Sequence, residues 1–109
     1  MDMIDACERI ESYIDGHDFL SFQNDMKTVD AVCRCLGIVG EAANSYTKHC
    51  RVADTNIQWS EIVSLRNRII HEYSTVNLKT VWGIGTEEVP LLKVQLTALL
   101  AELEERPVP

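Results

Sequence analysis

The stretch Arg66-Asn67-Arg68-Ile69-Ile70-His71-Glu72-Tyr73 places an arginine, a histidine and a tyrosine close together in a segment that predicts a helix. Around it, residues 57–73 repeat apolar side chains at the three- and four-residue spacing of one helical face. Arg66 falls near the middle of that apolar arc, and His71 falls on roughly the opposite side. The arc consists of Trp59, Ile62, Val63, Leu65, Ile69, Ile70 and Tyr73.

Arg66 is out of place on an apolar face, because an unpaired buried charge costs several kcal/mol. One role that would explain it is binding of a phosphate, since a guanidinium donates paired hydrogen bonds to phosphoryl oxygens. The other is a buried ion pair with a carboxylate such as Glu41. Arg66 can bind a phosphate and form the ion pair at the same time if the carboxylate orients the guanidinium. Conflicts of this kind between pattern and chemistry are typical of functional sites.

The rest of the chain has helical periodicity on both sides of this segment. Helices are expected at about residues 2–15, 29–49, 57–73 and 78–105, with a short helix or turn at 17–25 after the first. No internal repeat or linker separates them. The sequence therefore predicts an all-α protein, an up-and-down four-helix bundle in a single domain of residues 1–105, followed by a frayed tail at 106–109.

Several local features of these helices are predicted by residue type. Thr28 is a plausible N-cap for the second helix, and Gly37 and Gly40 indicate a close approach between helices. The last helix should be interrupted near residues 83–86 and bent near Pro90, because proline cannot donate a backbone hydrogen bond. The short segment after the first helix should insert three side chains into the core: Phe19, Leu20 and Phe22.

The spacing Arg-x4-His-x-Tyr resembles the signature of the HEPN domain, in the form found in HepT toxins of HEPN/MNT toxin–antitoxin modules. Residues 36–43, Leu-Gly-Ile-Val-Gly-Glu-Ala-Ala, are similar to the Ile-Gly-Glu-Ala helix of that family. Residues 57–63, 77–82 and 89–92 resemble the segments that flank the signature helix, in the same order. The resemblance spans nearly the whole chain. Ser74 departs from the pattern, since many relatives carry an aromatic residue there.

The resemblance implies an endoribonuclease whose catalytic residues are Arg66 and His71. Imidazole exchanges protons near neutral pH, which suits His71 to acid–base catalysis, whereas a histidine away from the core is otherwise simply solvated. Asn67, about one turn before His71, could fix the imidazole tautomer or be an ordinary exposed asparagine. Glu41 would support Arg66 by orienting it.

The resemblance also assigns Tyr73 as the acceptor of AMP groups from a cognate nucleotidyltransferase antitoxin. Such AMPylation would add bulky negative charge beside the cationic site and block RNA. From the residues alone, Tyr73 is equally well explained as a core tyrosine with its hydroxyl at the surface.

Arg66 and His71 lie about 140° apart around an ideal helix, so one straight helix cannot easily direct both to one phosphate. Either the long arginine reaches around, or the helix distorts, or a second protomer contributes. HEPN nucleases are dimers whose motifs face each other, so the resemblance implies a two-fold homodimer.

The net charge of −7 argues against a general affinity for nucleic acid. Its distribution is uneven, because residues 31–79 hold six bases against four acids, whereas residues 1–30 hold two bases against eight acids. RNA binding should therefore be local, weak and sensitive to salt.

No Cys-x2-Cys pair, histidine cluster or Gly-rich phosphate loop is present, so neither a metal nor another cofactor is expected and RNA cleavage should be metal-independent. The four cysteines are expected to be buried free thiols. The chain lacks both an apolar run long enough for a membrane span and a signal-like amino terminus, which predicts a cytoplasmic protein.

Two other functions remain open at this stage. The chain could be a non-catalytic nucleotide- or substrate-binding subunit of a nucleotidyltransferase complex, which the acidic charge favours slightly. A purely structural helical adaptor would account for the bundle, but it leaves Arg66 unexplained.

Overall fold

The computed structural model describes residues 1–49, 56–74 and 77–105, and within these ranges every regular element is helical. The all-α class is thus confirmed. The elements are α1 (Asp2–Ile14), α2 (Phe19–Gln23), α3 (Met26–His49), α4 (Trp59–Val63), α5 (Leu65–Ser74), α6 (Leu78–Gly83), the π-helical turn η1 (Ile84–Glu88) and α7 (Val89–Glu105). The tail expected at residues 106–109 lies outside the described residues.

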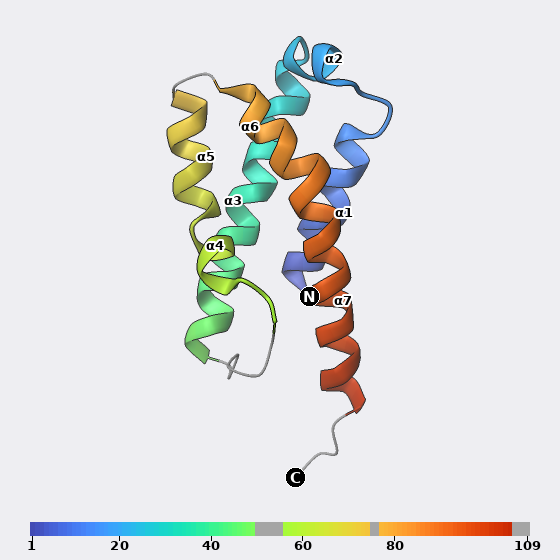
Figure 1. The fold of residues 1–109 in the computed structure, drawn as a ribbon, viewed down its shortest axis with the longest axis vertical. Helices are drawn as coiled ribbons and strands as arrows, with labels where there is room; N and C mark the ends of the chain where they lie inside the picture. The colour runs from blue at the N-terminus through green and yellow to red at the C-terminus, as the bar shows by residue number, and fades with distance from the viewer. Residues whose placement is uncertain (50–55, 75–76, 106–109) are drawn as a thin grey trace.

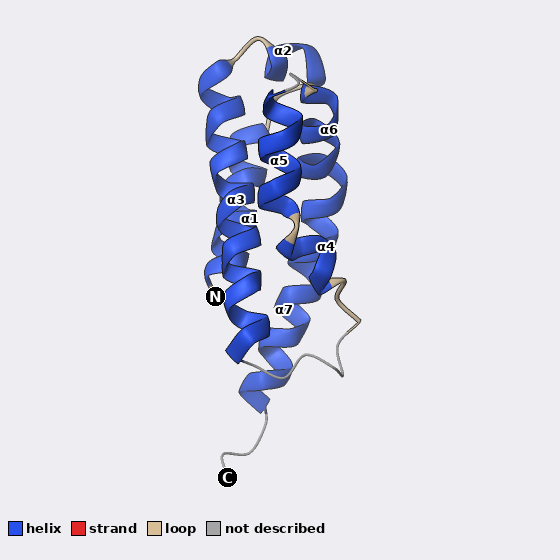
Figure 2. Ribbon diagram, turned by 90° about the vertical axis from the view of Figure 1, so that its left-hand side faces the viewer, coloured by secondary structure: helices blue, strands red, loops and turns tan. Residues whose placement is uncertain are grey.

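The helices form an elongated bundle of 52 × 26 × 19 Å (Figure 1). Helix α3 runs almost the whole length of the bundle, with α5 along one side of it and α1 along another (Figures 1 and 2). The α6–η1–α7 segment completes the bundle against α1. An apolar stripe of α3 faces this core, since Val29, Val32, Leu36, Val39 and Ala43 are fully buried.

The junction between α2 and α3 differs from the sequence expectation in two ways. Asp25, rather than Thr28, caps α3: its Oδ1 accepts from the Thr28 backbone N–H at 3.2 Å, and its Oδ2 from the Thr28 hydroxyl at 2.8 Å. These hydrogen bonds lower the pKa of Asp25 below its usual value. Phe22 is fully buried as expected, but Leu20 is 65% exposed, because α2 is a real helix and turns that side to solvent.

The single helix expected over residues 57–73 is wrong, because the chain breaks at Ser64 into α4 and α5. The Ser64 hydroxyl donates to the Glu61 carbonyl at 2.6 Å, a local bond with which serine competes against helical backbone pairing. The ψ angle of Ser64 is −8°, far from the helical value of about −42°. The break resets the helical phase, although Leu65 and Ile69, which belong to the expected apolar arc, are buried in α5 as predicted.

The same reset moves two residues off the expected apolar arc. Ile70 is 57% exposed, and the side chain of Arg66 is 59% exposed. The placement of Arg66 on a buried apolar face is therefore wrong.

The two glycines of α3 turn out to have different roles. A Cβ added at Gly40 would lie 3.1 Å from the backbone N of Arg66 and 3.3 Å from the carbonyl O of Ile62, so the predicted close approach is confirmed there. A Cβ at Gly37 would meet nothing within 4 Å, so helix packing does not explain that glycine.

Alanine should have opposite effects at these two positions. Gly40→Ala is expected to lower the free energy of unfolding by about 1–3 kcal/mol, because backbone atoms of the α4–α5 junction must move. Gly37→Ala is expected to raise it by about 0.5–1 kcal/mol, because alanine stabilises an open helical position. Urea unfolding followed by circular dichroism measures both changes, and equal shifts would contradict the assigned contact.

The irregularity expected near residues 83–86 is present, but as a π-helical turn rather than an interruption. The Val89 N–H donates to the Ile84 carbonyl five residues earlier, and Pro90, which follows, has no N–H to donate. The apolar face of α7 is buried at Leu92, Leu96 and Leu99, whereas Leu103 is 36% exposed near the end of the helix.

The cysteines of the described residues are free thiols. Cys7 and Cys35 are buried as expected, and Cys33 is partly buried. Burial raises the pKa of Cys7 to about 12 and that of Cys33 to about 11, so these thiols stay protonated at neutral pH. Cys50 lies outside the described residues. Within the described helices, none is long and apolar enough to cross a membrane.

Candidate active site

Arg66 lies in the first turn of α5 and pairs with Glu41 of α3, with Nη1 3.1 Å from Oε1. Gly40 makes this pairing possible, because its missing side chain lets the start of α5 approach the α3 backbone directly beside Glu41. The expected ion pair between Arg66 and Glu41 is thus present, but it is exposed rather than buried, with the two side chains 59% and 61% accessible.

An ion pair this exposed contributes about 0–1 kcal/mol to stability. What it does is hold the guanidinium in place at the surface, where it can meet a ligand.

His71 is exposed near the end of α5, as expected for a residue off the core face. Helix α5 is regular from Leu65 to Ser74, so the distortion considered above does not bring Arg66 and His71 together. Five residues of α-helix separate them by about 7.5 Å along the axis and about 140° around it. Asn67 and Ile70, which lie between them in sequence, are also exposed.

Tyr73 belongs to α5. Its side chain lies outside the described part of the structure, so the modification expected there is assigned by the motif alone.

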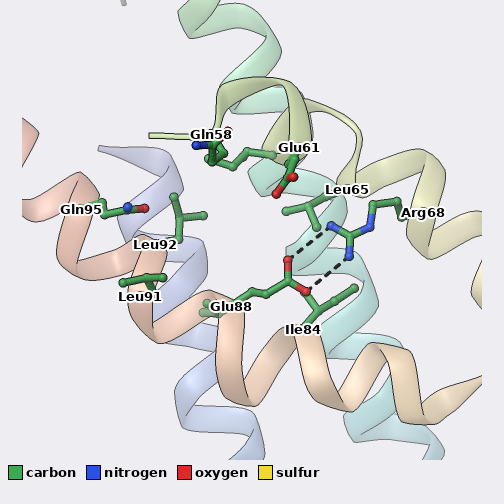
Figure 3. A pocket seen from close by; sticks show the side chains of 11 residues that line it. Gln58, Glu61, Leu65, Arg68, Ile84, Glu88, Leu91, Leu92 and Gln95 are labelled. Carbon is green, nitrogen blue, oxygen red and sulfur yellow. Dashed lines mark hydrogen bonds and ion pairs between the residues drawn. The ribbon is translucent and has the colours of Figure 1, made fainter. Parts of the chain in front are cut away.

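A second arginine of the motif stretch has a different role, which the sequence reasoning missed. Both terminal nitrogens of Arg68 lie within hydrogen-bond distance of the Glu88 carboxylate, at 3.4 and 3.3 Å (Figure 3). Arg68 and Glu88 line a pocket of about 150 Å³ between α4, α5, η1 and α7, with Leu91 and Leu92 on its far side. Arg68 follows Arg66 by two residues, so the two side chains leave the helix in different directions. This spacing could have shown from the sequence that the two arginines have different roles.

Among the described residues, no group of three His, Cys, Asp or Glu side chains is arranged to hold a metal ion. The chemistry available on the exposed side of α5 is that of a fixed cation, an imidazole and an amide.

Comparison with known proteins places the chain among ribonucleases. The family model described as "Ribonuclease HepT-like" matches residues 3–99. A protein named "Putative RNase TTE0752", from Caldanaerobacter subterraneus subsp. tengcongensis, is 32% identical over 98 residues, which cover 90% of this chain and 88% of the relative.

Two further relatives agree. "Probable ribonuclease HepT" of Thermococcus cleftensis is 34% identical over 92 residues, which cover 84% of each chain. "Putative RNase MJ0125" of Methanocaldococcus jannaschii is 30% identical over 105 residues, 96% of this chain and 90% of the relative. No solved structure matches the chain significantly. The helical bundle, the Arg66–Glu41 pair and the family match agree: the chain belongs to the HepT-like family and is a ribonuclease of the HEPN type.

Proposed function

We propose that this protein is the toxin of a HEPN/MNT toxin–antitoxin module and cleaves RNA with Arg66 and His71, without a metal ion. The observation that carries the proposal is the exposed guanidinium of Arg66, which Glu41 holds at the surface of the helix that also carries His71. The family match and the names of the relatives support RNA as the substrate.

In the proposed reaction, His71 takes the proton from a ribose 2′-hydroxyl while water protonates the departing 5′-oxygen, or His71 protonates the 5′-oxygen while water accepts the 2′-hydroxyl proton. The 2′-oxygen attacks the adjacent phosphorus and the bond to the 5′-oxygen breaks. Arg66 donates hydrogen bonds to the phosphoryl oxygens as negative charge builds on them. The products are a 2′,3′-cyclic phosphate and a free 5′-hydroxyl, and Asn67 supports His71 by fixing its tautomer.

A two-fold homodimer solves the geometric problem of the site. Because α5 is a regular α-helix, Arg66 and His71 of one protomer diverge by about 140°, whereas motifs of two protomers that face each other can converge. Ile70, an isoleucine 57% exposed between the two catalytic residues, is the kind of side chain that such an interface buries.

Regulation would act on the same helix. AMPylation of Tyr73, two residues after His71, by the cognate nucleotidyltransferase antitoxin would add a phosphate beside Arg66 and compete with RNA for it. A module of this kind works in the cytoplasm, where its RNA substrate and its antitoxin are found.

The direct test is cleavage of single-stranded RNA by the purified protein in EDTA and low salt. We expect fragments with cyclic phosphate ends, and no cleavage of DNA of the same sequence, because the nucleophile is the 2′-hydroxyl. Cleavage that stops when EDTA is added, or that cuts DNA equally well, would contradict the mechanism.

A further inference from the structure

Three basic residues of α3 are separated by seven and fourteen residues along the helix: Lys27, Arg34 and Lys48. Seven residues are nearly two helical turns, so these residues share one face and are spaced at multiples of about 10.5 Å along the axis. The position missing from the series is Glu41, which pairs with Arg66 at 3.1 Å. Arg66, whose charge Glu41 offsets, thus stands at the fourth position of the row, which we call the α3 row.

The α3 row lies at the surface. Lys27, Arg34 and Lys48 are all exposed, on the side of α3 opposite its buried stripe. Two other cations of the described residues are paired with carboxylates, Arg68 with Glu88 and Lys93 with Glu11. Within the described ranges, the three α3 residues have no carboxylate at ion-pair distance.

Gly37 lies on the same side of α3, between Arg34 and Glu41. It leaves the helix backbone bare there, since an added Cβ would meet no atom within 4 Å. Glycine lowers the stability of a helix interior relative to alanine, and among the described residues no packing contact at Gly37 compensates for this loss. Close approach of a ligand backbone is a second use of glycine, and it fits an uncovered position inside a cationic row.

Acidic residues limit the row on one side. A groove of about 360 Å³ between α1 and α3 is lined by Asp2 and Asp5 as well as Arg9, and it borders Glu41. These carboxylates repel a phosphate chain, which leaves the side of α3 next to α5 as the favourable path. Asp30 weakens the field between Lys27 and Arg34, so the attraction remains modest.

We propose that the α3 row binds the RNA strand that flanks the cleaved phosphate, with phosphates contacting Lys27, Arg34 and Lys48 on either side of Arg66. This proposal rests on the proposed function, because it assumes that the phosphate bound by Arg66 is the one at which the RNA is cleaved. The row spans 21 residues, about 32 Å of helix, so only RNA of several nucleotides can reach its ends. A strand bound in this way is held by charge and not by base sequence.

The test measures binding of a single-stranded RNA of about 20 nucleotides to proteins with and without changes in the α3 row. All of them carry His71→Ala, so that the RNA stays intact. The variant Lys27→Gln/Arg34→Gln/Lys48→Gln should reduce the slope of log affinity against log salt by about 2, since each phosphate contact on a single strand contributes about 0.7. Between 50 and 200 mM salt, these three contacts account for about a 20-fold change in affinity. Fluorescence anisotropy measures both quantities.

Two single variants provide a matched pair. Arg34→Gln and Lys79→Gln each remove one exposed cation, the first from the α3 row and the second from α6, where Lys79 lies over the Phe19 ring. Only Arg34→Gln is expected to weaken RNA binding. Gly37→Gln is expected to weaken it as well while keeping or raising the unfolding temperature, which rules out misfolding as the cause. Equal binding by Arg34→Gln and Lys79→Gln would overturn the proposal.

Cleavage separates this proposal from the one on which it rests. With His71 restored, the triple variant should cut a dinucleotide at the wild-type rate and a long RNA more slowly at low substrate concentration. Equal cutting of long RNA by both proteins would reject the α3 row and leave the ribonuclease mechanism standing. Binding that depends on the row, without cleavage of any RNA by the wild-type protein, would support the row and reject the mechanism.

Discussion

Replacement of His71 with alanine is expected to lower the rate of RNA cleavage by a factor of about 10²–10⁴, the usual contribution of a general acid or base. The fold should not change, because His71 is exposed on a regular helix and alanine has the higher helix propensity. The measurement is the single-turnover rate of cleavage of one labelled RNA, with the unfolding temperature of both proteins recorded beside it.

The chain contains two further histidines, and these provide matched controls. The Nδ1 of His17 lies 2.9 Å from the Ser21 hydroxyl, and the Nδ1 of His49 lies 2.8 Å from the Ser45 carbonyl. Neither belongs to α5, so His17→Ala and His49→Ala should cleave RNA at the wild-type rate. A His71→Ala protein that keeps its activity, or a control that loses it, would refute the role assigned to His71.

Replacement of Arg66 with alanine is expected to lower the cleavage rate by about 10²–10³, the effect of losing one donor to a developing oxyanion. Stability should change by less than about 1 kcal/mol, because the pair with Glu41 is exposed. A buried pair would have cost about 3–5 kcal/mol on losing one partner. Urea unfolding therefore separates a catalytic arginine from a structural one.

Two further variants test how Arg66 acts. Arg66→Lys keeps the charge but loses the planar pair of donors, so an intermediate rate is expected. Glu41→Gln keeps the guanidinium but removes the carboxylate that orients it, so it should lower the rate less than Arg66→Ala does. If Glu41→Gln were the more damaging change, the carboxylate itself would take part in the reaction.

Mixing the two inactive proteins tests the dimer. If each site takes Arg66 from one protomer and His71 from its partner, Arg66→Ala mixed with His71→Ala regains activity. The expected rate is about a quarter of wild type, since half of the dimers are mixed and each holds one complete site. If the mixture has no cleavage activity after the subunits have exchanged, a site made of Arg66 from one protomer and His71 from the other would be excluded.

The helices, the buried stripe of α3 and the residues of the motif could be predicted from the sequence because each depends on local spacing. Val29, Val32, Leu36, Val39 and Ala43 repeat with the period of a helix, and a face with that period is buried in almost any bundle. The position of the cap could not be predicted as reliably. Asp25 and Thr28 are both good caps, and the backbone that enters α3 selects Asp25.

The surroundings of Arg66 depended on tertiary structure. One serine, Ser64, interrupts the helical phase, which moves Arg66 from the expected apolar arc to the surface. Its partner Glu41 is 25 residues earlier in sequence, and the two meet because Gly40 admits the α5 backbone next to α3. Periodicity describes contacts within one helix, whereas a contact between helices depends on how closely they pack.

By itself, therefore, the sequence determined that this chain is an all-α bundle of the HepT-like family and which residues form its motif. It also held the spacing of Lys27, Arg34 and Lys48 at multiples of seven residues. Only the tertiary structure decided that Glu41 fills the gap in that spacing with Arg66 from another helix. The physical reason is that charge on a surface acts through space, and the distance between two helices is set by packing rather than by position along the chain.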